Sequence, residues 1–514
     1  MLHRRSLLAT AAILPLLPLA AQAQVTTLDI PPRAMPLKPD DTVAPGYRRT
    51  VLLRWGDRVT FDAPEWNPRR PTAQAAASQF GWDARICALV PAPPATDGVA
   101  RAILAVAHPT VDPAMAFPDG RDHPAVAAMM QGASLLNMEK QGGRWIVVDG
   151  GYQSRRLTAD TLCRITGPAA EAVGDTIQGL LGISGGCATP WGTLLLGEDD
   201  PASWLTRLRD LHPRFNEGTR FGWMVELDPL DPQSIPAKRS ALARFPRGDA
   251  AAALTADGRA VVYMTDRRAF GYLFRFISAS PANAPDALDA GTLSVARLDG
   301  RGLAWAALPS GAETTLNPLA AASQAAAVAF DVPSGLAIDP RSGRLYLACR
   351  GNAAWRPEQV DALNPLAGSS SGHVVEIIPA GGDHGAETAA ASLLLVGGSL
   401  RRASRRLAVP GRMRRRPWRW TGAGASGSAP TTPGAPGRRR IRFTAAILTG
   451  LGAGCPCRSM VHPSGPASAA RPSARMGRRC SAWRARQGPI RVPITPAPAP
   501  AGHSSTRQCR RAAP

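Results

Sequence analysis

The sequence contains very little lysine, and its C-terminal part contains no acidic side chain. Only three of the 60 basic residues in the 514-residue chain are lysines, namely Lys38, Lys140 and Lys238. All 38 acidic residues lie at or before Glu387, whereas 24 arginines follow that position. The net charge of +22 therefore comes from the C-terminal tail, and residues 1–387 are close to neutral. This distribution argues against nucleic acid as a partner of the body of the protein.

A hydrophobic run long enough to cross a bilayer is also missing. The N-terminal apolar stretch ends at Leu19, and the apolar segment 443–454 is equally short, whereas a membrane-spanning helix needs about 20 apolar residues. We therefore expect no transmembrane segment.

The first 23 residues have the pattern of an export signal. Arg4-Arg5 precedes the apolar stretch, and Ala21-Gln22-Ala23 follows it as a cleavage site of small residues, which is typical of a twin-arginine signal peptide over residues 1–23. The alternative is an apolar helix of a cytosolic protein, but Pro15 and Pro18 would break that helix. We expect a periplasmic or secreted protein.

Residues 391–514 form an arginine-rich tail that also contains much Ala, Pro, Gly, Ser and Thr. Such a composition cannot bury enough apolar surface to fold, so we expect disorder. One explanation is a shifted reading frame of a GC-rich gene, which yields an arginine-rich amino-acid sequence without acidic residues. The other is a real basic arm in which tryptophans are interleaved, suited to phosphate backbones or anionic lipid.

The body, residues 46–390, follows a short linker over residues 24–45 and reads as all-β. Short alternating runs are separated by Gly, Asp, Asn and Pro, as expected for strands joined by tight turns. Four segments have the pattern strand, turn, strand, and they are Leu135–Gly151, Leu254–Asp266, Gly291–Leu308 and Leu336–Cys349. The second and the fourth are similar to each other in sequence, and we call them the two echoing hairpins. Repeated hairpins of this type predict blades of a β-propeller, and the alternatives are a large sandwich or two stacked β domains. The segment 201–215 predicts one helix whose apolar face is Trp204, Leu205, Leu208 and Leu211.

The run GGCATPWGTLLLGEDD, residues 185–200, combines a thiol with three consecutive acids. Sulfur ligands favour iron or zinc, whereas clustered carboxylates favour calcium or magnesium. If the chain bends at Pro190-Trp191-Gly192, Cys187 could meet Glu198, Asp199 and Asp200 around a mixed metal site. The alternatives are that Cys187 is a small buried hydrophobic residue, and that the acids form a solvated loop in front of a helix.

Several collinear motifs resemble the PhoX-type alkaline phosphatases. The resemblance runs in order from Gly46 to Thr388, and its motifs are GYRRTVLLRWGD at 46–57, QFGWD at 79–83, YQSRRLTADT at 152–161, TPWGTLLLGEDD at 189–200, RFGWMVELDPLDPQSIPAKRSALARF at 220–245, VVYMTDRRAFGYLFRFIS at 261–278 and SGHVVEIIPAGGDHGAET at 371–388.

This resemblance implies a six-bladed propeller, incomplete here at its C-terminal blade. It also implies that loops on the propeller axis bind iron and calcium, and that the protein hydrolyses small phosphomonoesters. Cys187, Glu198, Asp199, Asp200 and Asp249 occupy or neighbour the family's metal-ligand positions, and we expect them to be the metal ligands here.

Arg155 and Arg156 are the candidates for clamping the substrate's phosphate, since paired guanidinium groups bind phosphate oxygens well. The alternative is that both arginines form ordinary surface salt bridges. We expect the protein to act as a monomer.

The sequence departs from the family pattern at three positions. The family's cysteine corresponds to Ser184, so Cys187 would have to reach from a shifted position. The family's acid after Arg-Phe-x-His corresponds to Gly248, with Asp249 one residue late. The family's Arg-Pro-Glu element is Val332-Pro333-Ser334 here, which loses a cation and a carboxylate. Each lost ligand weakens a site that holds several metal ions.

Two classes of function remain open from the sequence. One is a metal-dependent phosphatase, and the other is a propeller that has lost its metals and serves as a binding or structural module. The position of Cys187 separates them. If its side chain packs in an apolar layer far from Glu198 and Asp199, the second class is favoured.

Overall fold

The computed structural model describes residues 49–300, 302–397, 440–441 and 463–464. The predicted signal peptide and the linker lie outside the described residues, as does nearly all of the predicted tail. The chain divides into the units Met1–Ser464 and Gly465–Pro514. The second unit lies wholly outside the described residues, so the account below concerns the first.

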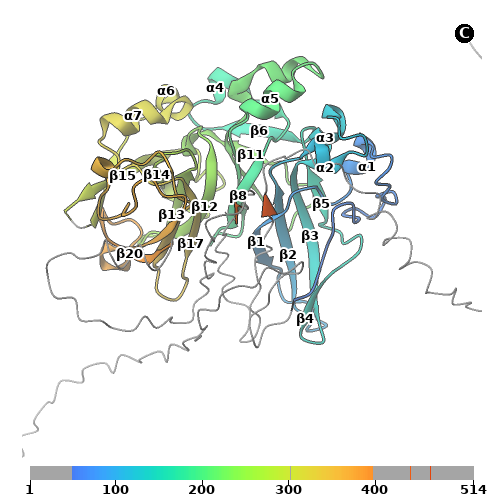
Figure 1. The fold of residues 1–514 in the computed structure, drawn as a ribbon. Coiled ribbons are helices and arrows are strands. Elements are labelled where there is room, and N and C mark those ends of the chain that lie inside the picture. The colour runs from blue at the N-terminus through green and yellow to red at the C-terminus, as the bar shows by residue number, and fades with distance from the viewer. Residues whose placement is uncertain (1–48, 301, 398–439, 442–462, 465–514) are drawn as a thin grey trace, which may run out of the picture. The chain divides into compact units, whose positions relative to one another are not determined.

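The described part is mostly β, and its first sheet is an antiparallel meander (Figure 1). Strands β1 to β4 lie side by side in chain order, and a short fifth strand pairs with the beginning of β3. β2 is buried along almost its whole length, so it reads as an apolar run rather than an alternating one. The strands are β1 (Arg85–Pro91), β2 (Arg101–His108), β3 (Gly132–Gln141), β4 (Arg144–Val147) and β5 (Arg155–Leu157).

A second meander follows, formed by β8 to β11, and it is extended by two earlier strands. β6 pairs in parallel with β11, and β7 pairs with β6. The strands are β6 (Leu162–Thr166), β7 (Thr176–Gln178), β8 (Ile183–Ala188), β9 (Leu194–Glu198), β10 (Met224–Leu227) and β11 (Ala237–Arg239).

The third sheet contains nine strands and joins two meanders at their outer edges. β12 to β16 follow one another, β17 to β20 do the same, and β16 pairs with β20. The strands are β12 (Arg247–Leu254), β13 (Arg259–Asp266), β14 (Leu273–Pro281), β15 (Gly291–Asp299), β16 (Gly302–Ala307), β17 (Pro333–Ile338), β18 (Leu345–Cys349), β19 (His373–Pro379) and β20 (Thr388–Val396).

All four segments predicted as hairpins fall in antiparallel strand pairs, namely β3–β4, β12–β13, β15–β16 and β17–β18. The segment Leu254–Asp266 contains the turn and β13 but only the last residue of β12, so most of that first strand lies before the predicted segment. In the two echoing hairpins the turn contains Gly258 or Gly343, each with a positive φ that suits glycine. β20 runs to Val396, beyond the predicted boundary of the body at residue 390. Two further short strands, β21 (Arg440–Ile441) and β22 (Pro463–Ser464), pair with each other.

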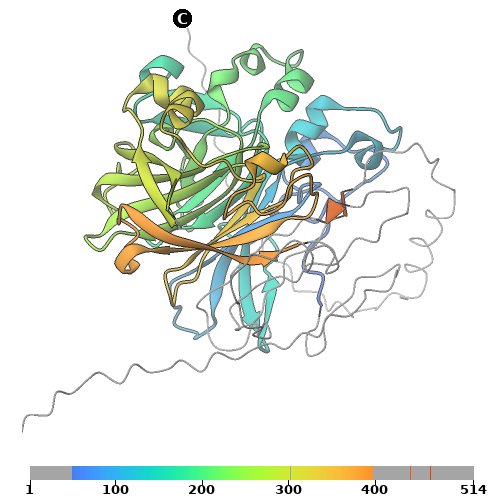
Figure 2. The ribbon, with the colours of Figure 1, turned by 60° about the vertical axis from the view of Figure 1, so that its left-hand side comes forward.

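The first strands of the four meanders pack against one another (Figure 1). β1 contacts β8, β8 contacts β12, and β12 contacts β17. Each of these inner strands lies at an edge of its sheet, and β12 and β17 are the two edges of the joined third sheet, whose strands run from green through yellow to orange in Figure 2. This arrangement resembles the radial packing of propeller blades, and it brings residues from four distant parts of the chain together.

Short helices lie at one end of the strands, at the top in Figure 1. The predicted helix is α5, which ends at Leu208. Trp204 and Leu208 are buried as expected, but Leu211 lies beyond the helix and is 45% exposed, so its assignment to the packed face was wrong. The α-helices are α1 (Ala73–Ala76), α2 (Pro113–Ala116), α3 (Pro124–Met130), α4 (Ala170–Val173), α5 (Ala202–Leu208), α6 (Ala312–Leu316) and α7 (Pro318–Gln324). No helix in the described ranges is long and apolar enough to cross a membrane.

Candidate functional site

Cys187 lies on β8, near the turn of the β8–β9 hairpin. It is opposite Leu195, whereas Glu198 is opposite Ile183 at the far end of the hairpin. Three residues along a strand span about 10 Å, so the hairpin holds Cys187 and Glu198 apart. The Cys187 side chain packs against the apolar cluster that contains Phe274. Burial, with smaller effects of nearby Asp249 and Cys87, raises the pKa of the Cys187 thiol above its usual range.

Glu198 ends β9 and is completely buried. Both of its carboxylate oxygens lie 3.1 Å from the Lys238 ammonium group on β11. The backbone amides of Leu181, Gly222 and Trp223 each donate a hydrogen bond of 2.9 Å to the same carboxylate. The ion pair and three amides satisfy this buried charge, which would otherwise be very costly.

Asp199 and Asp200 point to different partners. The Asp199 carboxylate forms an ion pair with the guanidinium group of Arg267. Asp200 is exposed, and its carboxylate accepts a 3.0 Å hydrogen bond from the amide of Ala202 at the beginning of α5. This is a local contact at a helix N-terminus, where a carboxylate is stabilised. The three consecutive acids therefore do not converge on one point.

Asp249 lies on β12 and is buried where the inner strands meet. Its Oδ2 lies 2.7 Å from Nη2 of Arg85 on β1 and accepts a 3.1 Å hydrogen bond from the amide of Leu336 on β17. Its Oδ1 accepts one of 3.2 Å from the amide of Gly186 on β8. A Cβ at Gly185 would lie 2.6 Å from this oxygen, so only glycine allows the approach. Burial raises the pKa of Asp249, and Arg85 opposes this rise.

Arg155 and Arg156 both donate to backbone carbonyl groups. Arg155 on β5 donates to Pro232 and Ser234, at 2.8 and 2.9 Å, and so holds the loop that follows β10. Arg156 is buried and donates to the carbonyl groups of Met129 and Gln131 and to the hydroxyl of Ser134. Burial lowers the pKa of Arg156 to about 9. These contacts position the chain around α3 and the loop after β10.

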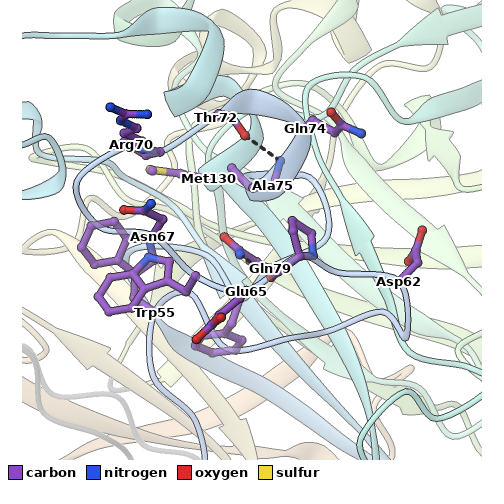
Figure 3. A pocket seen from close by; sticks show the side chains of 15 residues that line it. Trp55, Asp62, Glu65, Asn67, Arg70, Thr72, Gln74, Ala75, Gln79 and Met130 are labelled. Atoms are coloured by element: carbon purple, nitrogen blue, oxygen red, sulfur yellow. Dashed lines mark hydrogen bonds between the residues drawn. The ribbon is translucent and has the colours of Figure 1, made fainter. Parts of the chain in front are cut away.

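A pocket of about 330 Å³ lies elsewhere and is lined almost entirely by residues between Trp55 and Phe80 (Figure 3). Trp55 and Trp66 line it with ring centroids 5.2 Å apart in an edge-to-face arrangement. Arg70, Gln79 and Met130 also line it. None of the residues predicted as metal ligands or phosphate clamps lines this pocket.

The residues expected to hold iron and calcium do not fit a metal cluster. Within residues 49–300 and 302–397, no three His, Cys, Asp or Glu side chains lie close enough together to bind a metal ion. Glu198 and Asp249, the two buried carboxylates of the expected set, are instead paired with Lys238 and Arg85.

The sequence analysis missed Lys238 and Arg85. Lys238 could have been noticed, because a chain with three lysines places one of them inside the segment 220–245, which resembles a family motif. Arg85 lies outside the motifs that resemble the family, and nothing in its sequence neighbourhood distinguishes it from other arginines.

The buried carboxyl group of Asp331, just before β17, leads us to expect that the stability of the protein depends on pH. It is 1% exposed, and neither carboxylate oxygen has a hydrogen-bond partner among the described residues. Burial raises its pKa from 3.8 to about 7. Because the folded protein holds this proton more tightly than the unfolded chain, stability is lost as the pH rises through this window, at about 1.4 kcal/mol per pH unit.

Thermal unfolding at a series of pH values between 4 and 8 tests this expectation. We expect the unfolding temperature of Asp331→Asn to fall less than that of the wild type between pH 4 and 7. Parallel pH profiles of the two proteins would contradict a raised pKa at this position.

Taken together, the meanders packed on their inner strands define a mostly β protein with propeller-like packing of its sheets. A family model described as Alkaline phosphatase PhoX matches residues 30–413, which is more than half of the chain. The chain therefore belongs to the alkaline phosphatase PhoX family, and the resemblance drawn from the sequence motifs is confirmed.

A solved structure supports the same assignment. The chain is similar to "Pseudomonas fluorescens PhoX in complex with vanadate, a transition state analogue", with 28% sequence identity and a TM-score of 0.65. The similarity covers 72% of this chain and 76% of that one. A search of curated proteins gave no match.

Proposed function

We propose that this protein is an exported, phosphatase-like member of the PhoX family that hydrolyses small phosphomonoesters. The observation that carries the proposal is the extent of the structural match, because most of the chain aligns with a phosphatase solved with a transition-state analogue. Export is proposed from the Arg4-Arg5 leader. A six-bladed propeller is proposed from the resemblance, and the four meanders whose first strands pack together support this proposal.

The family resemblance implies iron and calcium, but the described residues do not fit these metals, so we derive no step through them. Arg155 and Arg156 remain the residues that we predict to bind the phosphate group of the substrate. To bind a phosphate, their guanidinium groups would have to exchange hydrogen bonds that now hold backbone carbonyl groups. A loss of these bonds would cost stability, because the buried carbonyl groups would then lack partners.

A second candidate function is a propeller that binds a partner or serves a structural role without catalysis. The position of Cys187 favours it, since the thiol packs in an apolar cluster and the hairpin register separates it from Glu198. The ion pairs of Glu198 and Asp249 with cationic side chains of the same chain favour it as well.

Phosphate release from a chromogenic monoester separates the two candidates. The full-length chain is assayed with added calcium and iron and again with a chelator, and its metal content is measured in parallel. Turnover above a buffer control supports the phosphatase. A folded protein with no turnover and no bound metal supports the second candidate. Pseudomonas fluorescens PhoX is the positive control for the assay.

Resequencing the gene across the codons for residues 385–400 tests the shifted-frame explanation of the tail. An alternative frame that restores acidic residues and further strand patterns would support it. Confirmation of the present frame would leave the basic arm, whose binding to anionic vesicles or nucleic acid should then weaken steeply with salt.

A further inference from the structure

The guanidinium group of Arg85 lies where four inner strands meet. Arg85 itself belongs to β1, and its Nη1 donates to the carbonyl oxygens of Ser184 on β8 and Gly248 on β12, at 2.6 and 2.8 Å. Its Nη2 donates to the Asp249 carboxylate at 2.7 Å and to the carbonyl oxygen of Ser334 on β17 at 3.3 Å. One cationic group thus joins the first strands of all four meanders.

The surroundings of this guanidinium group resemble those of a bound cation. Its partners are three carbonyl oxygens and one carboxylate, which are the hard donors that a calcium ion takes. The Arg85 side chain is 15% exposed and that of Asp249 is 7% exposed, so little solvent screens the pair. A guanidinium group carries one positive charge and several directed N–H donors in one plane, which suits several oxygen acceptors at once.

Three of the four partners are positions at which this chain departs from its family. Ser184, Gly248 and Ser334 stand where the resemblance implies a cysteine and two acids. The side chains of the two serines point to other partners, since their hydroxyl groups donate to the carbonyl oxygens of Arg247 and Val332. The backbone oxygens at these positions face Arg85 instead.

Gly248 has no room for the missing acid. A Cβ at this position would lie 2.7 Å from the Thr265 hydroxyl and 2.8 Å from the Pro333 carbonyl oxygen. Both distances are shorter than real Cβ contacts, so any side chain at Gly248 would push the neighbouring strand away. The close packing of β12 on β17 therefore requires glycine at position 248, and glycine has no side chain that could bind a metal ion.

We propose that Arg85 takes the place of a bound metal ion at the junction of the four inner strands, so that this part of the fold is held by a covalently attached cation and needs no metal there. The proposal goes beyond the proposed function. It concerns the cation at one junction, and it holds whether or not the protein releases phosphate from monoesters.

The test compares Arg85→Ala with the wild-type full-length chain by thermal unfolding. We expect the wild-type unfolding temperature to be unchanged by a chelator or by added calcium. We expect Arg85→Ala to unfold roughly 5–10 °C lower, because it leaves the Asp249 carboxylate buried without a cation. Added calcium or methylguanidinium should then raise the unfolding temperature of the variant and leave that of the wild type unchanged. Arg101→Ala, on the neighbouring strand β2, is the control for loss of an arginine and should show little change.

Three outcomes would overturn the proposal. The first is that a chelator lowers the unfolding temperature of the wild type, and the second is that Arg85→Ala unfolds at the same temperature as the wild type. The third is that neither calcium nor methylguanidinium raises the unfolding temperature of a destabilised Arg85→Ala. If Arg85→Ala does not fold, Arg85→Lys and Arg85→Met take its place, since they have similar lengths and differ in charge. Lys should then be clearly more stable than Met, and equal stability would show that packing and not charge matters. Phosphate release is not read in this experiment, so its outcome is separate from that of the phosphatase assay.

Discussion

Lys238→Met is expected to lower the free energy of unfolding by about 3–5 kcal/mol, the range for breaking a buried ion pair by removing one partner. Lys238 and Glu198 are both completely buried, and the ammonium group also donates to the carbonyl oxygen of Arg220 at 2.9 Å. The same group lies 4.7 Å from the centre of the Phe221 ring, a cation–π contact. Without it, the Glu198 carboxylate would lose its ion pair and keep the hydrogen bonds from three backbone amides. Chemical denaturation at neutral pH measures the loss.

The double variant Lys238→Met with Glu198→Gln distinguishes the effect of the unpaired charge on stability from the effect of lost packing. Removing both charges should restore part of the lost stability, because the remaining groups are neutral and the amides keep an acceptor. Lys140→Met is the matched control, as it removes another of the three lysines from a half-buried position on β3, and we expect a change within about 0.5 kcal/mol. A Lys238→Met protein as stable as the control would contradict a structural ion pair.

Asp249→Asn is expected to cost about 3–5 kcal/mol as well, because it leaves the Arg85 guanidinium group without its counter-charge in a buried place. The amide of Asn would also present N–H donors where Asp249 now accepts bonds from Arg85 and from the amides of Leu336 and Gly186. Thermal or chemical unfolding measures the effect. Loss of a metal ligand would give a different result, in which the stability of the wild type, but not of the variant, depends on added metal.

Asp200→Asn is the natural control for Asp249→Asn. Both residues were expected to bind metal, but Asp200 is exposed and accepts a bond from Ala202 at the beginning of α5. Because the side-chain oxygen of Asn can accept the same local hydrogen bond, this variant should keep its stability within about 0.5 kcal/mol. If the two variants lose stability equally, the junction of inner strands is not the special position that the geometry indicates.

The hairpins show what sequence patterns can predict in this protein. The segments Leu254–Asp266 and Leu336–Cys349 each contain a turn with Gly258 or Gly343, and each turn joins two antiparallel strands. These features are local, because the turn and the alternation act over fewer than fifteen residues. The end of α5 was less predictable, since Leu211 continues the apolar spacing of the helix but lies beyond its last turn.

The arrangement of the candidate site, in contrast to the hairpins, could not be predicted from local sequence patterns. The chain does bend in the motif at residues 185–200, where the structure forms the β8–β9 hairpin. The same antiparallel register places Cys187 near the turn and Glu198 at the far end, so the hairpin that the motif encodes also keeps the thiol away from the acid. Proximity in sequence therefore did not become proximity in space.

By itself the sequence determined the class of this protein: a mostly β chain of the PhoX family with an export signal as its predicted leader, because strand patterns, turns and family motifs are written in short consecutive segments. Only the tertiary structure decided which charges meet. Arg85 and Asp249 are 164 positions apart and Lys238 and Glu198 are 40 apart, and each pair forms because neighbouring strands bury both groups together. A buried charge is stabilised by an opposite charge close to it in the interior, and the packing of distant strands decides which one that is. A local sequence pattern does not contain this information.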